Sequence, residues 1–209
     1  IPDGATDAFF QPSISGKQAS VYEHCARALE ASLTRGAHGL PLIGTGDWND
    51  GMNAVGARGR GESSWLGWFL LSTIDTLAPF AGQRGETERM QHWRDYADDL
   101  RGALERAWDG EWYRRGYYDD GAPLGSHESD ECRIDTIAQS WSVMAGATDP
   151  LHAAQAMASV DRLLVDHPNA IACLFTPPFD HARENPGYIK GYPPGVRENG
   201  GQYTHGATW

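Results

Sequence analysis

The sequence contains few cysteines, and their placement argues against two classes of small protein. The 209 residues include only Cys25, Cys132 and Cys173, which are odd in number and widely spaced. Because no two of them form a C-x-x-C pair, a disulfide framework and a zinc knuckle are both disfavoured. We therefore expect a reducing compartment.

Positive charge and long apolar runs are also scarce. The formal net charge is −11 at pH 7, which argues against a surface for nucleic acid or anionic membranes, since both require basic patches. No segment reaches the roughly 18–20 consecutive apolar residues of a membrane span, and the first residues do not form a signal sequence. We expect a small-ligand protein with no nucleic-acid partner and no direct membrane contact from this segment.

The length suits one domain or part of one. A chain of 209 residues can enclose one sizeable core, and no fixed repeat, low-complexity tract or linker divides it. It begins without methionine and stops at Trp209 inside a patterned segment. We expect residues 1–209 to be a piece of a longer protein.

Apolar periodicity predicts mainly helices. In residues 86–108 apolar side chains recur every three or four positions while charged ones fill the opposite face, as in an amphipathic helix. Residues 20–33 have the same character, with Ser20 as the expected N-cap. Two further helices are expected at residues 135–145 and 150–165.

Proline marks the expected limits of two helices. Residues 64–80 are apolar almost all round, which predicts a buried helix that Pro79 would end. Asp149 and Pro150 suit the cap and first position of the last long helix. Both assignments rest on the fixed φ angle and the missing N–H of proline.

Two segments are expected to be non-helical. In residues 112–118 a glycine interrupts paired aromatic residues, which predicts a short β-hairpin or an extended loop. Residues 173–201 hold so many prolines and glycines that a long helix is excluded there. A loop of that length in a compact domain is usually functional.

The stretch GTGDWNDGMN, residues 44–53, places two aspartates among glycines. As a calcium loop counted from Asp47 it fails, because Gly51 comes one place too early and Arg58 replaces the bidentate glutamate. A dinucleotide loop would need a third glycine. The neighbouring GARGRGES has the glycine spacing of a phosphate-binding loop, but Glu62 stands where the lysine must be.

Acid chemistry beside an aromatic ring remains open for this stretch. A carboxylic acid can protonate a glycosidic oxygen when burial or a second carboxylate raises its pKa. Asp50, with Asp47 and Trp48 beside it, supplies these parts. The alternative is that both aspartates merely cap turns, and spacing alone favours neither interpretation.

Four separated motifs resemble glycoside hydrolase family 94, the inverting phosphorylases of β-linked glucosides. They are GTGDWNDGMN with GESSWLGWF, then DTIAQSW, LFTPPFD and GYIKGYPPGVRENGGQYTH, in the order of the family. Within it, EHCARALEASL and YRRGYYDDGAPLGS make the chain most similar to the C-terminal phosphorylase-like region of cyclic β-1,2-glucan synthases. Cellobiose phosphorylases share the RENGG core but differ directly after it, at residues 202–204.

The resemblance implies a fold and a place within it. The fold class is all-α, part of an (α/α)6 barrel with long functional loops and a minor β-hairpin. Residues 1–209 would be the C-terminal part of a single catalytic domain whose N-terminal β-sandwich and first barrel helices lie elsewhere. By this likeness the segment would be cytoplasmic, as a domain of a larger inner-membrane protein, and it is compatible with a homodimer.

The resemblance also implies a reaction. Asp50 corresponds to the general acid that protonates the leaving oxygen while inorganic phosphate attacks the anomeric carbon and releases α-glucose 1-phosphate. Phosphate is itself the nucleophile, so no carboxylate need activate water. The partners would be a β-glucan oligosaccharide and inorganic phosphate as co-substrate, without a cofactor, and the role would be control of chain length within a cyclic β-1,2-glucan synthase.

Further residues take expected roles from the same likeness. Glu198 corresponds to a residue that holds sugar hydroxyls, His205 to one that contacts phosphate, and Trp48 to one beside the sugar subsites. A protonated histidine would offer phosphate two N–H donors. We infer that Asp47 orients Asp50, and Gln202 and Tyr203 are candidates for the lining of the site. Taken singly, Glu198 could be a solvated loop charge and His205 a core histidine.

Glycines and histidines complete these expectations. Gly200 and Gly201 would let the backbone approach the ligand. No two histidines have the H-x-x-x-H spacing of a helical metal site, so no metal is expected. Two other functions stay open: an inverting hydrolase of the α/α-barrel kind with Glu198 as its base, and a glucan-binding fragment without activity. Cellobiose phosphorylase-like specificity is a further alternative.

Overall fold

Helices dominate the chain in the computed structural model, which describes residue 11 and residues 13–209. They are α1 (Val21–Ser32), α2 (Ser64–Gln83), α3 (Thr87–Arg106), α4 (Thr136–Met144), α5 (Pro150–Leu164) and the short α6 (Thr204–Ala207). Two 3-10 turns, η1 (Asp50–Met52) and η2 (Tyr188–Gly191), lie in the loops. The predicted mostly helical character and all five longer helices are confirmed.

Side-chain caps explain where four of these helices begin, namely α1, α2, α4 and α5. The hydroxyl of Ser20 accepts a hydrogen bond from Glu23 N at 3.1 Å, as predicted. Asp149 caps α5 with Pro150 in the first turn, which also confirms the prediction. Ser63 and Asp135 cap α2 and α4 in the same way. Local sequence therefore sets these boundaries.

The predicted end of α2 at Pro79 is wrong, because the helix continues to Gln83. Pro79 is exposed, so water can satisfy the carbonyl that loses its partner. Ala78 and Ala81 on the opposite face are buried, at 3% and 0% exposure. Packing of that face carries the helix through the proline.

The strands form three small antiparallel sheets. The first joins β1 (Glu62–Ser63), β2 (Gly116–Tyr117) and β3 (Pro123–Leu124), the second β4 (Ile134–Asp135) and β7 (Phe175–Thr176), and the third β5 (Val165–Asp166) and β6 (Ile171–Ala172). The hairpin expected within residues 112–118 is shifted, since β2 pairs forward with β3 and backward with β1. A Cβ on Gly116 would lie 2.0 Å from the Glu62 carbonyl oxygen, so glycine permits this close pairing.

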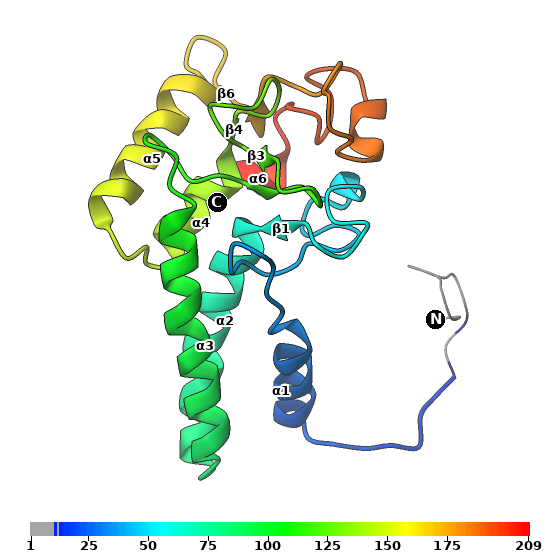
Figure 1. Cartoon of the computed structure of the whole chain (residues 1–209), viewed down its shortest axis with the longest axis vertical. Coiled ribbons are helices and arrows are strands. Elements are labelled where there is room, and N and C mark those ends of the chain that lie inside the picture. The colour runs from blue at the N-terminus through cyan, green and yellow to red at the C-terminus, as the bar shows by residue number, and fades with distance from the viewer. Residues whose placement is uncertain (1–10, 12) are drawn as a thin grey trace.

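The loops gather at one end of a helical pair. Figure 1 shows α2 and α3 as long antiparallel neighbours, with α1 beside α2, β1 at the start of α2 and β6 farther away near α5. Trp68, Leu71, Trp93, Leu100 and Leu104 are at most 1% exposed and form the core between the two helices. The long loop expected at residues 173–201 holds only β7 and η2 among its regular elements, and it lies in this loop region. The helices thus form a rigid base for the loops that carry the motifs.

Candidate active site

The DWND loop turns its two aspartates in opposite directions. Asp47 accepts hydrogen bonds from Asn49 N at 2.9 Å and from the Ser63 hydroxyl at 2.6 Å. Its carboxylate also pairs with Arg115 at 2.7 Å, and both side chains are fully buried. Asp50 begins η1 and is exposed. Asp47 therefore faces the interior while Asp50 faces outward.

The RENGG loop is held by its asparagine. The Asn199 side chain is 0% exposed. It accepts from Phe179 N at 2.7 Å and donates to the carbonyls of Phe179 and Tyr192, each at 2.8 Å. These three bonds tie residues 179, 192 and 199 together and so fix the loop that carries Glu198.

The glycines that follow are packed closely against the chain's own backbone, and their expected approach to a ligand stays a prediction. Gly200 has a φ of +76°, and a Cβ there would lie 2.9 Å from the Phe175 carbonyl oxygen. A Cβ on Gly201 would lie 2.7 Å from the Gly195 carbonyl oxygen. Both positions need glycine because the protein's own backbone approaches them.

These two loops, together with Tyr188 of η2 and the start of α6, line one shared hollow of about 320 Å³. Its lining residues are Trp48, Asp50, Tyr188, Arg197, Glu198, Tyr203 and His205. Five of the seven residues expected from the sequence are therefore brought together, although they come from segments some 150 positions apart in the chain. Such convergence of polar groups around an aromatic ring suits a sugar ligand.

Two expected site residues lie elsewhere. Asp47 is committed to Arg115 and Ser63, so its carboxylate cannot bind substrate directly. Gln202 points away from the hollow, and its side-chain oxygen accepts a hydrogen bond from Ala172 N at 3.0 Å. The inference that Asp47 orients Asp50 stays a prediction, and since the Asp47 carboxylate is held by Arg115 and Ser63, any such effect runs through the backbone of the loop.

Trp48 and His205 are joined directly across the hollow. The indole Nε1 donates to His205 Nδ1 at 3.0 Å, and the two rings meet edge to face with centroids 5.6 Å apart. An accepting Nδ1 carries no hydrogen, so Nε2 is the nitrogen left to donate. The two N–H donors expected of this histidine are thus reduced to one.

The charged side chains of Asp50, Arg197 and Glu198 line the hollow beside two tyrosines. Glu198 is 7% exposed, and its Oε2 lies 3.2 Å from Arg197 Nε. The negative charge of Glu198 and then burial raise the pKa of Tyr203. Burial and a hydrogen bond to Asp50 raise the pKa of Tyr188 to about 12. Both tyrosines therefore keep their O–H donors at neutral pH.

Tyr188 and Arg197 belong to the hollow but were not predicted as site residues. Tyr188 lies in GYIKGY, a motif noted for the family resemblance, so the signal was present without pointing to this side chain. Arg197 has a φ of +54° and stacks over Tyr192 at 4.6 Å. Its backbone conformation could not be read from the sequence.

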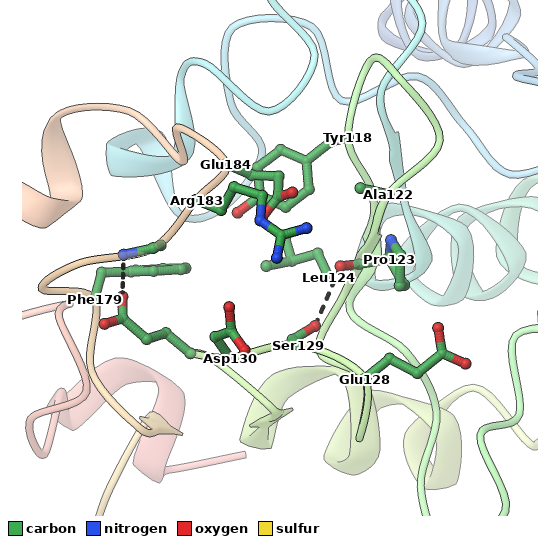
Figure 2. Close-up of a pocket in the computed structure, with 12 residues that line it drawn as sticks. Tyr118, Ala122, Pro123, Leu124, Glu128, Ser129, Asp130, Phe179, Arg183 and Glu184 are labelled. Carbon is green, nitrogen blue, oxygen red and sulfur yellow. Dashed lines mark hydrogen bonds between the residues drawn. The ribbon is translucent and has the colours of Figure 1, made fainter.

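A second polar cavity of about 240 Å³ lies apart from the predicted site residues. Figure 2 shows Arg183 and Glu184 beside Tyr118 on one side of it, facing Ser129 and Asp130 on the other. The carboxylate of Glu131, which also lines it, accepts hydrogen bonds from the backbone N–H groups of residues 180–182. This cavity shares no lining residue with the hollow around Asp50.

Two further observations concern the part of the chain that the structure describes. Within residues 11 and 13–209, no three or more His, Cys, Asp and Glu side chains are grouped to hold a metal ion. No helix in these residues is long and apolar enough to cross a membrane.

The chain belongs to the Glycosyl hydrolase 94 superfamily, because the model of its catalytic domain matches residues 5–209. The class of protein defined by the motifs and the hollow is thereby that of the family 94 phosphorylases and their relatives.

Individual relatives narrow the comparison. The chain is 54% identical over 211 residues to the cyclic beta-(1,2)-glucan synthase NdvB of Rhizobium meliloti, covering 100% of the chain and 8% of that protein. It is 37% identical over 193 residues to a 3-O-beta-D-glucopyranosyl-beta-D-glucuronide phosphorylase of Paenibacillus borealis, covering 91% and 25%. A cellobionic acid phosphorylase of Neurospora crassa is 36% identical over 196 residues, covering 93% and 24%. The chain thus spans a quarter or less of these relatives.

Proposed function

We propose that this chain contributes the acid loop and the sugar and phosphate contacts of an inverting phosphorylase that acts on β-linked glucans, with β-1,2-glucan as the favoured substrate. The observation that carries the proposal is the convergence of Trp48, Asp50, Glu198 and His205 on one hollow. The similarity to NdvB favours the β-1,2 linkage. The phosphorylase relatives favour transfer to phosphate over transfer to water.

The reaction assigns one step to each residue. Asp50 donates its proton to the glycosidic oxygen as the bond from the anomeric carbon to that oxygen breaks. A phosphate oxygen forms the new bond to the anomeric carbon from the opposite face, which gives α-glucose 1-phosphate. Glu198, buried beside Arg197, accepts hydrogen bonds from sugar hydroxyls. The Nε2–H of His205 donates to phosphate, while Trp48 holds the ring through Nδ1.

We also propose the larger setting of this site. Residues 1–209 would form the C-terminal part of a single (α/α)6 catalytic domain, whose remaining helices complete the hollow. Within a cyclic β-1,2-glucan synthase, phosphorolysis would trim the glucan and help set its length. The domain would be cytoplasmic in a larger inner-membrane protein, and homodimer formation is compatible with this arrangement.

Asp50→Asn in the longest polypeptide that carries this chain tests the reaction. We expect glucose 1-phosphate release from β-1,2-glucooligosaccharides to require inorganic phosphate and to fall at least about 100-fold in the variant, since the amide cannot donate an acidic proton. The measurement is an enzymatic assay of glucose 1-phosphate with and without phosphate.

Asp161→Asn is the matched control, because the Asp161 side chain is 65% exposed and pairs with the exposed His167. It should keep wild-type activity. Free glucose formed without a phosphate requirement would assign the site to the hydrolases, with Glu198 as the base to replace next. Sugar binding that survives loss of the Asp50 carboxylate, without any product, would indicate a binding module.

A further inference from the structure

Behind the DWND loop lies a cluster of buried charges that the hollow does not contain. The Arg115 side chain is 0% exposed, and its guanidinium lies 2.7 Å from Asp47 Oδ1 and 3.2 Å from Asp135 Oδ2. It also donates to the Ser63 hydroxyl at 3.0 Å. Asp47 and Asp135 are 0% and 1% exposed. One cation therefore joins the DWND loop to the N-cap residues of α2 and α4.

This cluster is costly to build, which argues for a role beyond stability. Burying ions carries a desolvation penalty that their attraction often fails to offset, and apolar residues of similar volume commonly serve as well. Here two carboxylates share one guanidinium, and burial raises the pKa of Asp135 to about 6. Unlike apolar packing, a cluster of ions fixes the orientation of each side chain in it.

Backbone hydrogen bonds connect the fixed Asp47 side chain to the turn that begins at Asp50. Asp47 Oδ1, which receives the Arg115 hydrogen bond, also accepts from Asn49 N at 2.9 Å. Asn49 O in turn accepts from Met52 N at 3.1 Å. Gly46, with a φ of +132°, approaches so closely that a Cβ there would lie 3.1 Å from Asp50 Cα. The loop between Gly46 and Met52 is thus held from its buried side.

Arg115 itself does not line the hollow. It lies directly before β2, where Arg115 N donates to the Leu124 carbonyl at 2.8 Å and its own carbonyl accepts from Ser64 N at 3.1 Å. A Cβ on Gly125 would meet the Arg115 Cβ at 2.5 Å, so the backbone of the next strand region fits closely against it. The direct contact of Arg115 with the DWND loop is its pair with Asp47.

We propose that Arg115 is a positioning residue that holds Asp50 in its reactive place by fixing Asp47 on the buried side of the same loop. This inference rests on the proposed function, in which Asp50 is the acid. It adds a residue to the catalytic machinery that never touches the substrate. Lysine cannot replace arginine here, because a single ammonium cannot reach Asp47, Asp135 and Ser63 in the geometry of a planar fork.

The test is the Arg115→Lys variant of the full-length protein that contains residues 1–209. We expect kcat for β-1,2-glucooligosaccharides to fall about 100-fold, as small misplacements of a catalytic group do. The KM for phosphate should change less than about twofold, because the phosphate contact comes from His205 on another segment. An aryl β-glucoside with a strongly acidic phenol as leaving group needs no proton from Asp50, so its phosphorolysis should fall only a few-fold.

Matched variants separate positioning from general damage. Arg162→Lys changes an exposed pair with Glu111 and should leave every rate unchanged. Asp47→Asn keeps the volume and removes the charge, so it should repeat the selective loss if Arg115→Lys folds poorly. An unchanged kcat, or an equal loss on both substrates, would overturn the proposal.

Hydrogen exchange decides the question without activity. Arg115→Lys should speed exchange of the amides of residues 47–52 by about tenfold or more and leave the amides of α3 unchanged. If the amides of residues 47–52 exchange at the same rate in Arg115→Lys and in wild type, the positioning role is refuted, whatever the activity of the enzyme. If wild type releases no glucose 1-phosphate but the loop still loosens, the proposed function fails while the link from Arg115 to the loop stands.

Discussion

At the scale of single residues, two aspartates three positions apart have different tasks because different neighbours meet them. Asp47 is drawn inward by Arg115 and Ser63, whereas Asp50 opens onto the hollow. The two ring nitrogens of His205 also differ in their partners, because Nδ1 accepts a hydrogen bond from the Trp48 indole and Nε2 is left to donate. The role of each side chain is therefore decided by the residues that it contacts and not by its residue type alone.

Trp48→Phe tests the link between the indole and His205. Phenylalanine keeps an aromatic ring but removes the N–H, so Nδ1 loses its donor and the ring is free to rotate. One such hydrogen bond contributes about 0.5–1.5 kcal/mol, which corresponds to a KM for phosphate raised about 2- to 13-fold. Steady-state kinetics with phosphate as the varied substrate measures this.

Trp108→Phe serves as the control for that substitution. Trp108 stacks on His152 at 4.1 Å, and neither residue lines the hollow. The control should leave the KM for phosphate unchanged. Equal values for Trp48→Phe and wild type would show that the indole does not hold His205 for phosphate.

At the scale of elements, buried carboxylates close several of the loops. Asp119 accepts hydrogen bonds from the backbone N–H groups of Arg58, Arg60 and Gly61, at 2.7–2.9 Å. The glycine-rich stretch with phosphate-loop spacing therefore does turn its amides toward an anion, but that anion is the protein's own aspartate. Glu62 holds residues 38 and 40 in the same manner.

Asp119→Asn should change how the stability depends on pH. Although burial opposes it, the three backbone hydrogen bonds lower the pKa of Asp119 below 3.8. A lowered pKa in the folded state gives stability that is present above the unfolded value and lost as the pH falls through the folded value. The variant should be about 2 kcal/mol less stable at pH 7 and should lose less stability than wild type below about pH 4.

Urea unfolding at several pH values compares the two proteins. Asp161→Asn is again a suitable control, because loss of this exposed carboxylate should change neither the free energy of unfolding at pH 7 nor its dependence on pH. Parallel curves for wild type and Asp119→Asn below pH 4 would contradict the assignment.

At the scale of the whole molecule, the hollow is open and several large apolar side chains lie on the surface. Phe69 and Phe80 on α2, Val143 and Met144 on α4, and Leu151 on α5 are between 45% and 76% exposed. Apolar surface of this kind commonly marks a contact with further protein. The relatives are at least about four times the length of the segment that the chain matches.

Residues 1–209 produced alone should therefore release no measurable glucose 1-phosphate, while the longest polypeptide that carries them should. The physical reason is that Asp50, which lines the hollow, is exposed to water here. The glucose 1-phosphate assay on both proteins at equal concentration provides the comparison. Equal turnover by the two would show that this chain holds a complete site.

The sequence by itself determined the five longer helices, the caps of α1 and α5, and the family. Amphipathic periodicity and caps such as Ser20 and Asp149 depend on neighbours within a few positions, so they could be read directly. Motif order likewise pointed to five of the residues that line the hollow. Local chemistry and family pattern are both written along the chain.

Only the tertiary structure decided which groups are free to act. Trp48 meets His205 across 157 positions, and Arg115 meets Asp47 across 68. Pro79 remains helical because a distant core covers the opposite face of α2, and Gln202 turns to the backbone of Ala172. Hydrogen bonds and burial depend on such distant partners, so the carboxylate that is buried and the carboxylate that faces the hollow are distinguished only once the chain has folded.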